Sequence, residues 1–374
     1  MQLIESLLAS LQQPLPRAFP ASPWQGEYRL QPQDFMVEEV LGFEPEGQGE
    51  HLYLWIEKTG SNTPFVAQEL ARKAGIHPSA VTFSGLKDRH AVTRQWFCLH
   101  LPGKVDPALD SLNGDNWQVL NACRHPRKLK RGTHRANRFQ LRIRINNADA
   151  STGEWLQQRW QEILSNGAPN YFGPQRFGHG GQNLQQGLNW LLATTRPKPP
   201  KRQDRSIWLS ATRSALFNRW LAESLQQHQW LNPLPGSCFN LQGTRSYFSD
   251  PQAAEDELIS RIKRQDLNPA GPLAGKGWPQ THGLAAEAEE AFQRQWQGLW
   301  SALENQGLKR EYRPLRMLAE QPLLAWQAPW LTLGFTLPSG CFATSLLREL
   351  VDAKDAMTRE HAKVTTQSSQ ELLP

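Results

Sequence analysis

The stretch RFQLRIRI at residues 138–145 alternates apolar and polar side chains without a break. Successive side chains of a β-strand point to opposite faces of a sheet, so this alternation predicts a strand with one face in the core and the other in solvent. The polar positions are arginines and one glutamine. We therefore expect a sheet that buries one face and presents a basic surface on the other.

Shorter segments of the N-terminal half predict further strands and one helix. Alternating or β-rich runs occur at residues 35–37, 52–56, 81–83 and 94–99. Between them, Thr63 is a suitable helix cap, Pro64 is tolerated at the first helical position, and Gly75 marks the helix end. The charged segment 84–91 separates two of the predicted strands and is expected at a strand end.

The length of the chain favours two folding units, because 374 residues exceed what one core comfortably organises. From about residue 151 the pattern becomes helical, and it includes expected helices at 208–225 and 285–306 and a Pro- and Gly-rich loop at 268–283. β character returns at 330–337, and Gly340 introduces a last helix. These shifts predict a second unit near 151–316 that interrupts the first. The polar tail from about Asp352 is expected to fray.

Cysteine usage and the N-terminus bear on cofactors and compartment. The four cysteines form no C-x-x-C pair and have no paired histidines nearby, which argues against a zinc site or a disulfide scaffold. The N-terminus carries Glu5 and lacks a basic region followed by an apolar stretch, so no signal peptide is expected. No window reaches the length of a membrane span. We expect reduced thiols, no metal, no membrane association and a cytoplasmic location.

The positive charge of the chain is concentrated in the segment RHPRKLKRGTHRANR, residues 124–138, which contains no acid. Such a block is either a solvated loop or a surface for a polyanion. The second interpretation is favoured because the block continues into the basic strand. A further cluster in the middle of the chain adds to it, formed by Arg196, Lys198, Lys201, Arg202 and Arg205. We predict RNA phosphate contacts at Arg127, Lys128 and Lys130.

The segment GLKDRHA, residues 85–91, places Asp88 between Lys87 and Arg89. Neighbouring cations favour an ionised carboxylate, and Gly85 would allow a substrate to approach closely. Asp88 could attack an anomeric carbon, or it could be one half of a structural ion pair. Taken alone, the segment does not decide between these roles.

Four segments in the same order resemble the TruD family of tRNA pseudouridine synthases. The segment GLKDRHAVT at 85–93 is similar to the catalytic signature, in which the aspartate is the nucleophile. The others are DFMVEE at 34–39, NYFGPQRFG at 170–178 and, in the last helix region, FATS at 342–345 followed by REL at 348–350. The box at 170–178 is the most specific of them.

The resemblance implies roles for individual residues. Asp88 would be the nucleophile, Phe35 the aromatic residue facing the target uracil, Asn137 a polar substrate contact and Phe342 a wall of the base pocket. Each has a structural alternative: the two phenylalanines as core residues and Asn137 as a turn or cap residue. Further RNA contacts are predicted at Lys87, Arg89 and Arg176. Much of the box around Tyr171 and Phe172 is expected to organise packing.

The resemblance also implies an α/β fold of the α+β kind. A pseudouridine synthase catalytic domain with a central, mostly antiparallel sheet would comprise residues 1–162 and 317–374. An inserted α/β TRUD domain would comprise residues 163–316. The implied activity is isomerisation of uridine, at position 13 of tRNA, to pseudouridine without a cofactor. The family is also expected to act as a monomer with no obligate protein partner.

Two other function classes remain open on the residues alone. One is an RNA-binding or RNA-folding protein that keeps the architecture without the catalysis. The other is a nuclease that uses Asp88 with His90, which would need a cluster of carboxylates for metal ions.

Overall fold

The computed structural model describes residues 2–193, 199–250 and 255–357, which divide into two compact units. The sheet unit comprises Ser22–Gln161, Ala319–Gly340 and Leu350–Pro374. The helix-rich unit comprises Met1–Ala21, Glu162–Leu318 and Cys341–Glu349. No helix in the described part of the chain is both long enough and apolar enough to cross a membrane.

Residues 1–21 and 341–349 were expected in the same unit as the central sheet, but in the structure they group with the middle of the chain. The helix α1 (Gln2–Leu11) packs its apolar side chains onto Leu184 and Leu188. In the 341–349 segment, Ser345 donates to the backbone oxygen of Tyr171 at 3.1 Å. Contacts far apart in sequence thus determine the unit to which each segment belongs.

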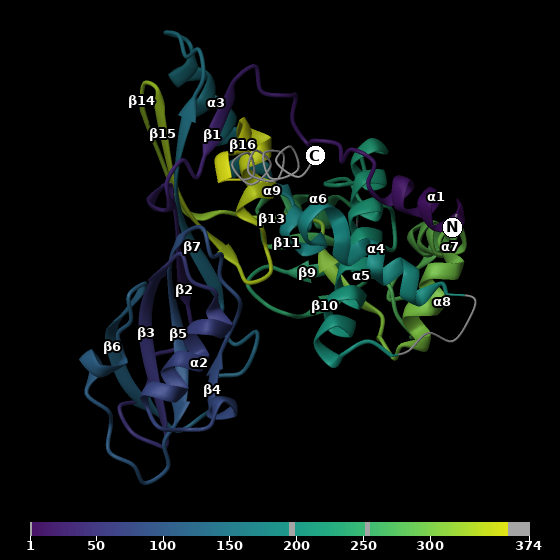
Figure 1. Ribbon diagram of the computed structural model, residues 1–374. Coiled ribbons are helices and arrows are strands. Elements are labelled where there is room, and N and C mark those ends of the chain that lie inside the picture. The colour runs from purple at the N-terminus through teal and green to yellow at the C-terminus, as the bar shows by residue number, and fades with distance from the viewer. Residues whose placement is uncertain (1, 194–198, 251–254, 358–374) are drawn as a thin grey trace, which may run out of the picture. The chain divides into compact units, whose positions relative to one another are not determined.

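The sheet unit is built on a ten-stranded sheet with the order β14-β15-β7-β2-β5-β3-β6, to which β1, β16 and β4 are added (Figure 1). Neighbouring strands run antiparallel except in the pairs β2–β5 and β1–β16. This confirms the predicted α+β class with a mostly antiparallel central sheet. The strands are β1 (Gln25–Tyr28), β2 (Phe35–Val40), β3 (His51–Thr59), β4 (Val81–Phe83), β5 (Val92–His100), β6 (Trp117–His125), β7 (Ala136–Ile145), β14 (Glu320–Gln327), β15 (Trp330–Pro338) and β16 (Asp352–Asp355).

The strand β7 has the two faces that its alternation predicts. Phe139, Leu141 and Ile143 are buried, whereas the arginines and the glutamine between them are exposed. On the buried face, Trp160 of α3 (Thr152–Asn166) lies 6.0 Å from Phe335 of β15, measured between ring centroids. The core of this part of the unit therefore lies between α3 and the sheet.

The helix α2 (Thr63–Lys73) covers another part of the sheet by packing Val66, Leu70 and Ala71 into a cluster with Leu54 and Phe97. The residue at its N-cap is Asn62 and not Thr63 as predicted. The Thr63 hydroxyl instead donates to the side-chain oxygen of Gln95 at 2.8 Å. Thr63 thereby connects the start of the helix to β5.

The C-terminal tail is ordered at its start. The strand β16 pairs in parallel with β1, and the backbone nitrogen of Asp352 donates to the oxygen of Trp24 at 3.2 Å. The prediction that the chain frays from Asp352 is therefore wrong for residues 352–355, because the edge of β1 offers them hydrogen-bond partners. The rest of the predicted tail, 358–374, lies outside the described residues.

The helix-rich unit combines helices with a four-stranded sheet of order β10-β9-β11-β12 and the pair β13–β8. Its strands are β8 (Ala168–Pro169), β9 (Cys238–Leu241), β10 (Tyr247–Phe248), β11 (Leu267–Leu273), β12 (Glu311–Pro314) and β13 (Arg316–Met317). Besides α1, its helices are α4 (Gln182–Leu191), α5 (Arg202–Gln226), α6 (Glu255–Lys263), α7 (Gly283–Gln295), α8 (Gln297–Asn305) and α9 (Ala343–Leu350).

Two predictions for this unit need correction. Residues 268–283 were expected to be a loop, but the first part forms β11, where Pro269 still accepts a hydrogen bond from the backbone nitrogen of Leu315 at 2.8 Å. The single helix expected at 285–306 is interrupted at Trp296, which leaves helical geometry and is buried in the core. In both cases the tertiary environment prevails over the local pattern.

Candidate active site

Asp88 lies in the loop of residues 84–91 that joins β4 to β5, as the charged segment predicted. Hydrogen bonds from the surrounding strands fix the backbone of this loop. Gln95 Nε2 donates to the backbone oxygen of Gly85 at 3.1 Å, and Lys58 Nζ donates to that of Asp88 at 2.9 Å. The backbone nitrogen of Gly60 donates to the oxygen of Arg89 at 3.0 Å. In the other direction, the backbone nitrogen of Lys87 donates to Thr63 Oγ1 at 3.1 Å. The loop is therefore held rigidly against β3, α2 and β5.

The carboxylate of Asp88 has a donor at each oxygen. Arg29 forms an ion pair with Oδ2, and the backbone nitrogen of His90 donates to Oδ1 at 3.1 Å. The side chain of Asp88 is 14% exposed. An ionised carboxylate with this orientation and limited access to water is suited to nucleophilic attack or to stabilising a developing cation.

Arg29 is a site residue that the sequence analysis missed. Its guanidinium bridges Asp88 and Asp355, with 2.7 Å from Nη2 to Asp355 Oδ2, and it lies 4.9 Å above the ring of Phe35. Burial alone would lower the pKa of Arg29, but the two carboxylates outweigh it and raise that pKa. Arg29 also has a φ of 59°, a conformation that is uncommon outside glycine. Its proximity to the D-F-M-V-E-E segment was the only sequence signal.

Lys58 is a second missed residue. It is 1% exposed, and its ammonium group donates to the backbone oxygens of Asp88 and Ser61, both at 2.9 Å. Burial lowers the pKa of Lys58 to about 8, and the charge of Asp88 partly opposes this shift. The contact links residues far apart in sequence, so no local motif could have indicated it.

Lys87 occupies a different position from the one predicted. Its ammonium group lies 2.8 Å from a carboxylate oxygen of Glu39, and both side chains are buried. Burial raises the pKa of Glu39, while Lys87 opposes that shift. Lys87 is thus held inside the loop by Glu39, and its predicted RNA contact stays a prediction. The lack of a side chain at Gly85 makes room for the His134 ring, because a Cβ at position 85 would lie 3.2 Å from His134 Cε1.

Phe35 is buried at the start of β2, with ring centroids 6.0 Å from Tyr28 and 6.3 Å from Phe139. The Arg29 guanidinium packs over the rings of Tyr28 and Phe35 in this aromatic cluster. The structure thus brings Phe35 close to the partner of Asp88, while the predicted contact with a uracil stays a prediction.

Asn137 lies in β7, paired with Glu39 of β2, and is neither a turn nor a cap residue. It is 9% exposed, and among the described residues its Oδ1 has no hydrogen-bond partner. Its Nδ2 lies 3.5 Å from His134, whose ring also contacts Ser84 and Ser339. A buried acceptor without a partner is costly, which fits an atom reserved for a ligand.

Phe342 and Arg176 belong to the helix-rich unit and lie close together there. The Arg176 guanidinium is 5.8 Å from the Phe342 ring and 5.2 Å from the Phe172 ring, and it donates to Ser210 Oγ at 2.9 Å. Burial lowers the pKa of Arg176. Tyr171 and Phe172 are buried in one core cluster, so much of the 170–178 box organises packing, as predicted. The predicted contact of Arg176 with phosphate stays a prediction.

The middle of the basic block, residues 126–135, is a loop between β6 and β7 with an internal anchor. Arg127, Lys128 and Lys130 are exposed, whereas Leu129 is fully buried, and the Tyr53 hydroxyl donates to the oxygen of Arg127 at 2.9 Å. Arg89 is also exposed. In the second basic cluster, Lys201, Arg202 and Arg205 are exposed, and Arg196 and Lys198 lie outside the described residues.

Comparisons with known proteins agree with one another. The sequence matches the family model described as "tRNA pseudouridine synthase D (TruD)" over residues 18–185 and 200–350. It is 42% identical to the "tRNA pseudouridine synthase D" of Methylococcus capsulatus, over 90% of this chain and 94% of the relative. The protein of the same name from Azotobacter vinelandii is 43% identical, with the same coverage. A crystal structure titled as the putative tRNA pseudouridine synthase D of Methanosarcina mazei shares the fold, with a TM-score of 0.67, 18% identity and coverage of 90% of this chain and 95% of that chain.

Proposed function

Because the chain belongs to the tRNA pseudouridine synthase D family, we propose that it isomerises uridine 13 of tRNA to pseudouridine, with Asp88 as the nucleophile and without a cofactor. The observation that carries the role of Asp88 is its ion pair with Arg29 on a loop whose backbone is fixed. The carboxylate is thereby oriented before the substrate arrives.

The reaction exchanges one bond to the sugar for another. Asp88 attacks C1′, the bond from C1′ to N1 breaks, and the electron pair leaves with the uracil. The uracil turns within the site, its C5 forms the new bond to C1′, and the carboxylate departs. The C5 proton is released and N1 gains one, so the reaction involves no net redox change. A carboxylate serves a similar purpose in retaining glycosidases.

The neighbouring residues prepare Asp88 for this step. Arg29 and the backbone nitrogen of His90 each donate to one carboxylate oxygen of Asp88 and thereby fix its orientation. Lys58 fixes the peptide oxygen of Asp88, which limits rotation of the loop. Because these groups hold Asp88 in place beforehand, little rearrangement of the site is needed to reach the transition state.

The base must leave its stack to reach the partly buried carboxylate of Asp88. We propose that Asn137 Oδ1 accepts a hydrogen bond from the uracil, which would satisfy this unpartnered buried acceptor. The contacts of Phe35 and Phe342 with the base are proposals that rest on the family resemblance. The same holds for action as a monomer, without a protein partner, in the cytoplasm.

The experiment uses unmodified tRNA that carries tritium at C5 of its uridines. The C5 proton is lost during isomerisation, so we expect the wild type to release tritium and Asp88→Asn to release none above background. The asparagine keeps the size of the side chain and an acceptor for His90. Equal binding of tRNA by both proteins serves as the control. Equal tritium release by both would exclude Asp88 as the nucleophile, and no release by either would leave a tRNA-binding protein.

A further inference from the structure

Trp278 of the helix-rich unit exposes 93% of its surface to solvent. It lies in the loop of residues 274–282, between the end of β11 and the start of α7. Single exposed apolar residues are common on protein surfaces and need no function of their own. Trp278 differs because both ends of its loop are anchored.

The first anchor is a close contact between backbones. The nitrogen of Lys276 donates to the oxygen of Leu308 at 2.8 Å, and the nitrogen of Arg310 donates to the oxygen of Lys276 at 2.9 Å. These bonds place Lys276 and Lys309 side by side as partners of an isolated parallel bridge. A Cβ at Gly275 would lie 2.4 Å from the carbonyl carbon of Lys309, so the approach requires glycine there.

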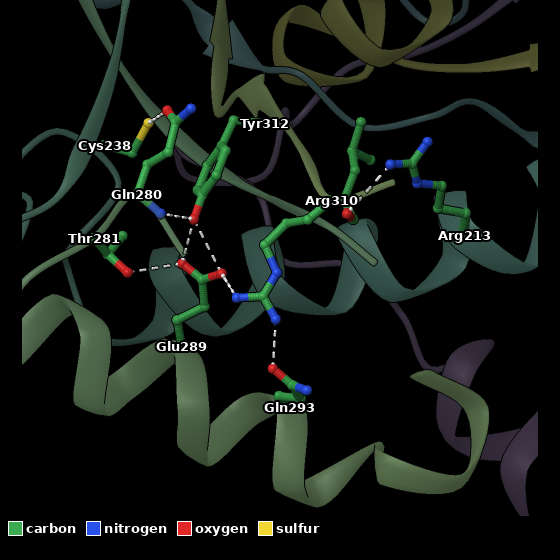
Figure 2. A network of polar contacts seen from close by, with 9 residues as sticks. Arg213, Cys238, Gln280, Thr281, Glu289, Gln293, Arg310 and Tyr312 are labelled. Atoms are coloured by element: carbon green, nitrogen blue, oxygen red, sulfur yellow. Dashed lines mark hydrogen bonds and ion pairs between the residues drawn. The ribbon is translucent and has the colours of Figure 1, made fainter. Parts of the chain in front are cut away.

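The second anchor is a buried polar network (Figure 2). The backbone nitrogen of Gln280 donates to the hydroxyl of Tyr312 at 2.9 Å, and the Thr281 hydroxyl donates to Glu289 at 3.0 Å. Glu289 also accepts from Tyr312 at 2.9 Å and pairs with Arg310 at 3.1 Å. One buried carboxylate of α7 therefore connects the end of the loop to β12 and to the residue beside Lys309.

The result is an anchored loop that exposes the indole of Trp278 two residues from Lys276, which is paired through its backbone with Lys309. Lys276 and Lys309 are both exposed. Like charges held side by side repel each other unless an anion is present, and an exposed indole on a fixed loop loses little conformational entropy on binding. Stacking aromatics flanked by lysines are the means by which proteins bind unpaired nucleotides.

We propose that Trp278, Lys276 and Lys309 form an RNA-binding site of the helix-rich unit, in which Trp278 stacks on an unpaired tRNA base and the lysines contact adjacent phosphates. The inference rests on the proposed function, since it takes tRNA as the ligand. It assigns to this unit a contact with the substrate that is separate from the chemistry at Asp88.

The test measures affinity for unmodified tRNA at several salt concentrations with full-length protein. Stacking of one base contributes about 1–3 kcal/mol, so Trp278→Ala should weaken binding by about 5-fold or more, whereas Trp278→Phe should retain most of the affinity. The double variant Lys276→Ala/Lys309→Ala should reduce the salt dependence by about one to two counterions. The matched charge control is Lys263→Ala/Arg264→Ala, two exposed cations on or next to α6, which should leave both quantities unchanged.

Tritium release separates this inference from the proposed function. At saturating tRNA, Trp278→Ala should release tritium at the wild-type rate, with only the KM for tRNA increased. Wild-type affinity in Trp278→Ala would overturn the RNA-binding site even if the enzyme is active. A loss of affinity in the charge control as large as in the lysine pair would overturn it as well. Equal unfolding midpoints of all variants verify that the exposed substitutions leave the fold intact.

Discussion

At the scale of single residues, the candidate site centres on Asp88, whose carboxylate pairs with Arg29 and whose backbone oxygen is bound by Lys58. Asp88 was identified because its segment, together with three others in the same order, resembles the TruD family. Arg29, Lys58 and Asp355 were not, because each lies far from Asp88 in the sequence and comes close to it only in the folded sheet unit. Sequence adjacency to Asp88 did not reveal that the Lys87 side chain turns toward the buried Glu39, and its RNA contact stays a prediction.

Arg29→Met should lower the rate of tritium release at saturating tRNA by about 10-fold or more, because it removes a charge-assisted hydrogen bond to a partly buried carboxylate. The KM for tRNA should change little, since the Arg29 side chain is only 6% exposed. The matched control is Arg144→Met, which removes an exposed cation from β7 of the same unit. If Arg29→Met raises KM and leaves the maximal rate unchanged, Arg29 binds RNA and does not orient Asp88.

The buried ammonium group of Lys58 predicts a pH-dependent stability. Its pKa is about 8 in the folded protein against an ordinary value of 10.5, so between these pH values the unfolded chain binds more protons. The free energy of unfolding of the wild type minus that of Lys58→Met should therefore rise with pH across this window, by at most about 3 kcal/mol. Below pH 7 this difference should be constant. Urea unfolding of both proteins at several pH values measures the difference. A difference that stays flat or falls from pH 8 to 10.5 would contradict a lowered pKa for Lys58.

At the scale of elements, strands with clean alternation were predicted well and irregular segments poorly. β7 is alternating in sequence and in burial, and α2 spans the expected residues. β11 was missed because its prolines and glycine suggest a loop, although neighbouring strands supply its partners on both sides. β16 was missed because polar residues form a strand there only through the edge of β1.

The loop of residues 126–135 gives a prediction at this scale. Replacing Arg127, Lys128 and Lys130 by alanine should weaken tRNA binding and flatten its salt dependence by up to about three counterions, because all three side chains are exposed on an anchored loop. Titrations from low to physiological salt measure both quantities. Leu129 is left unchanged so that the anchor persists. Unchanged affinity and salt slope would make this loop a merely solvated surface.

At the scale of the whole molecule, the family and the fold class followed from four short segments spread over most of the chain. The boundaries of the two units did not, because α1 and the 341–349 segment join the helix-rich unit through contacts distant in sequence. The candidate site of the sheet unit is assembled from β1, β2, β3, β7, β16 and the loop after β4.

The account depends on Asp88 converting one uridine of tRNA. The most direct measurement is a time course of pseudouridine formation in an unmodified tRNA, read at nucleotide resolution by a chemical label that adds mass to pseudouridine. We predict that the wild type converts uridine 13 alone to pseudouridine and that Asp88→Asn forms no pseudouridine at any position. Pseudouridine at position 13 with the asparagine variant at the wild-type rate, or none with the wild type, would contradict the account.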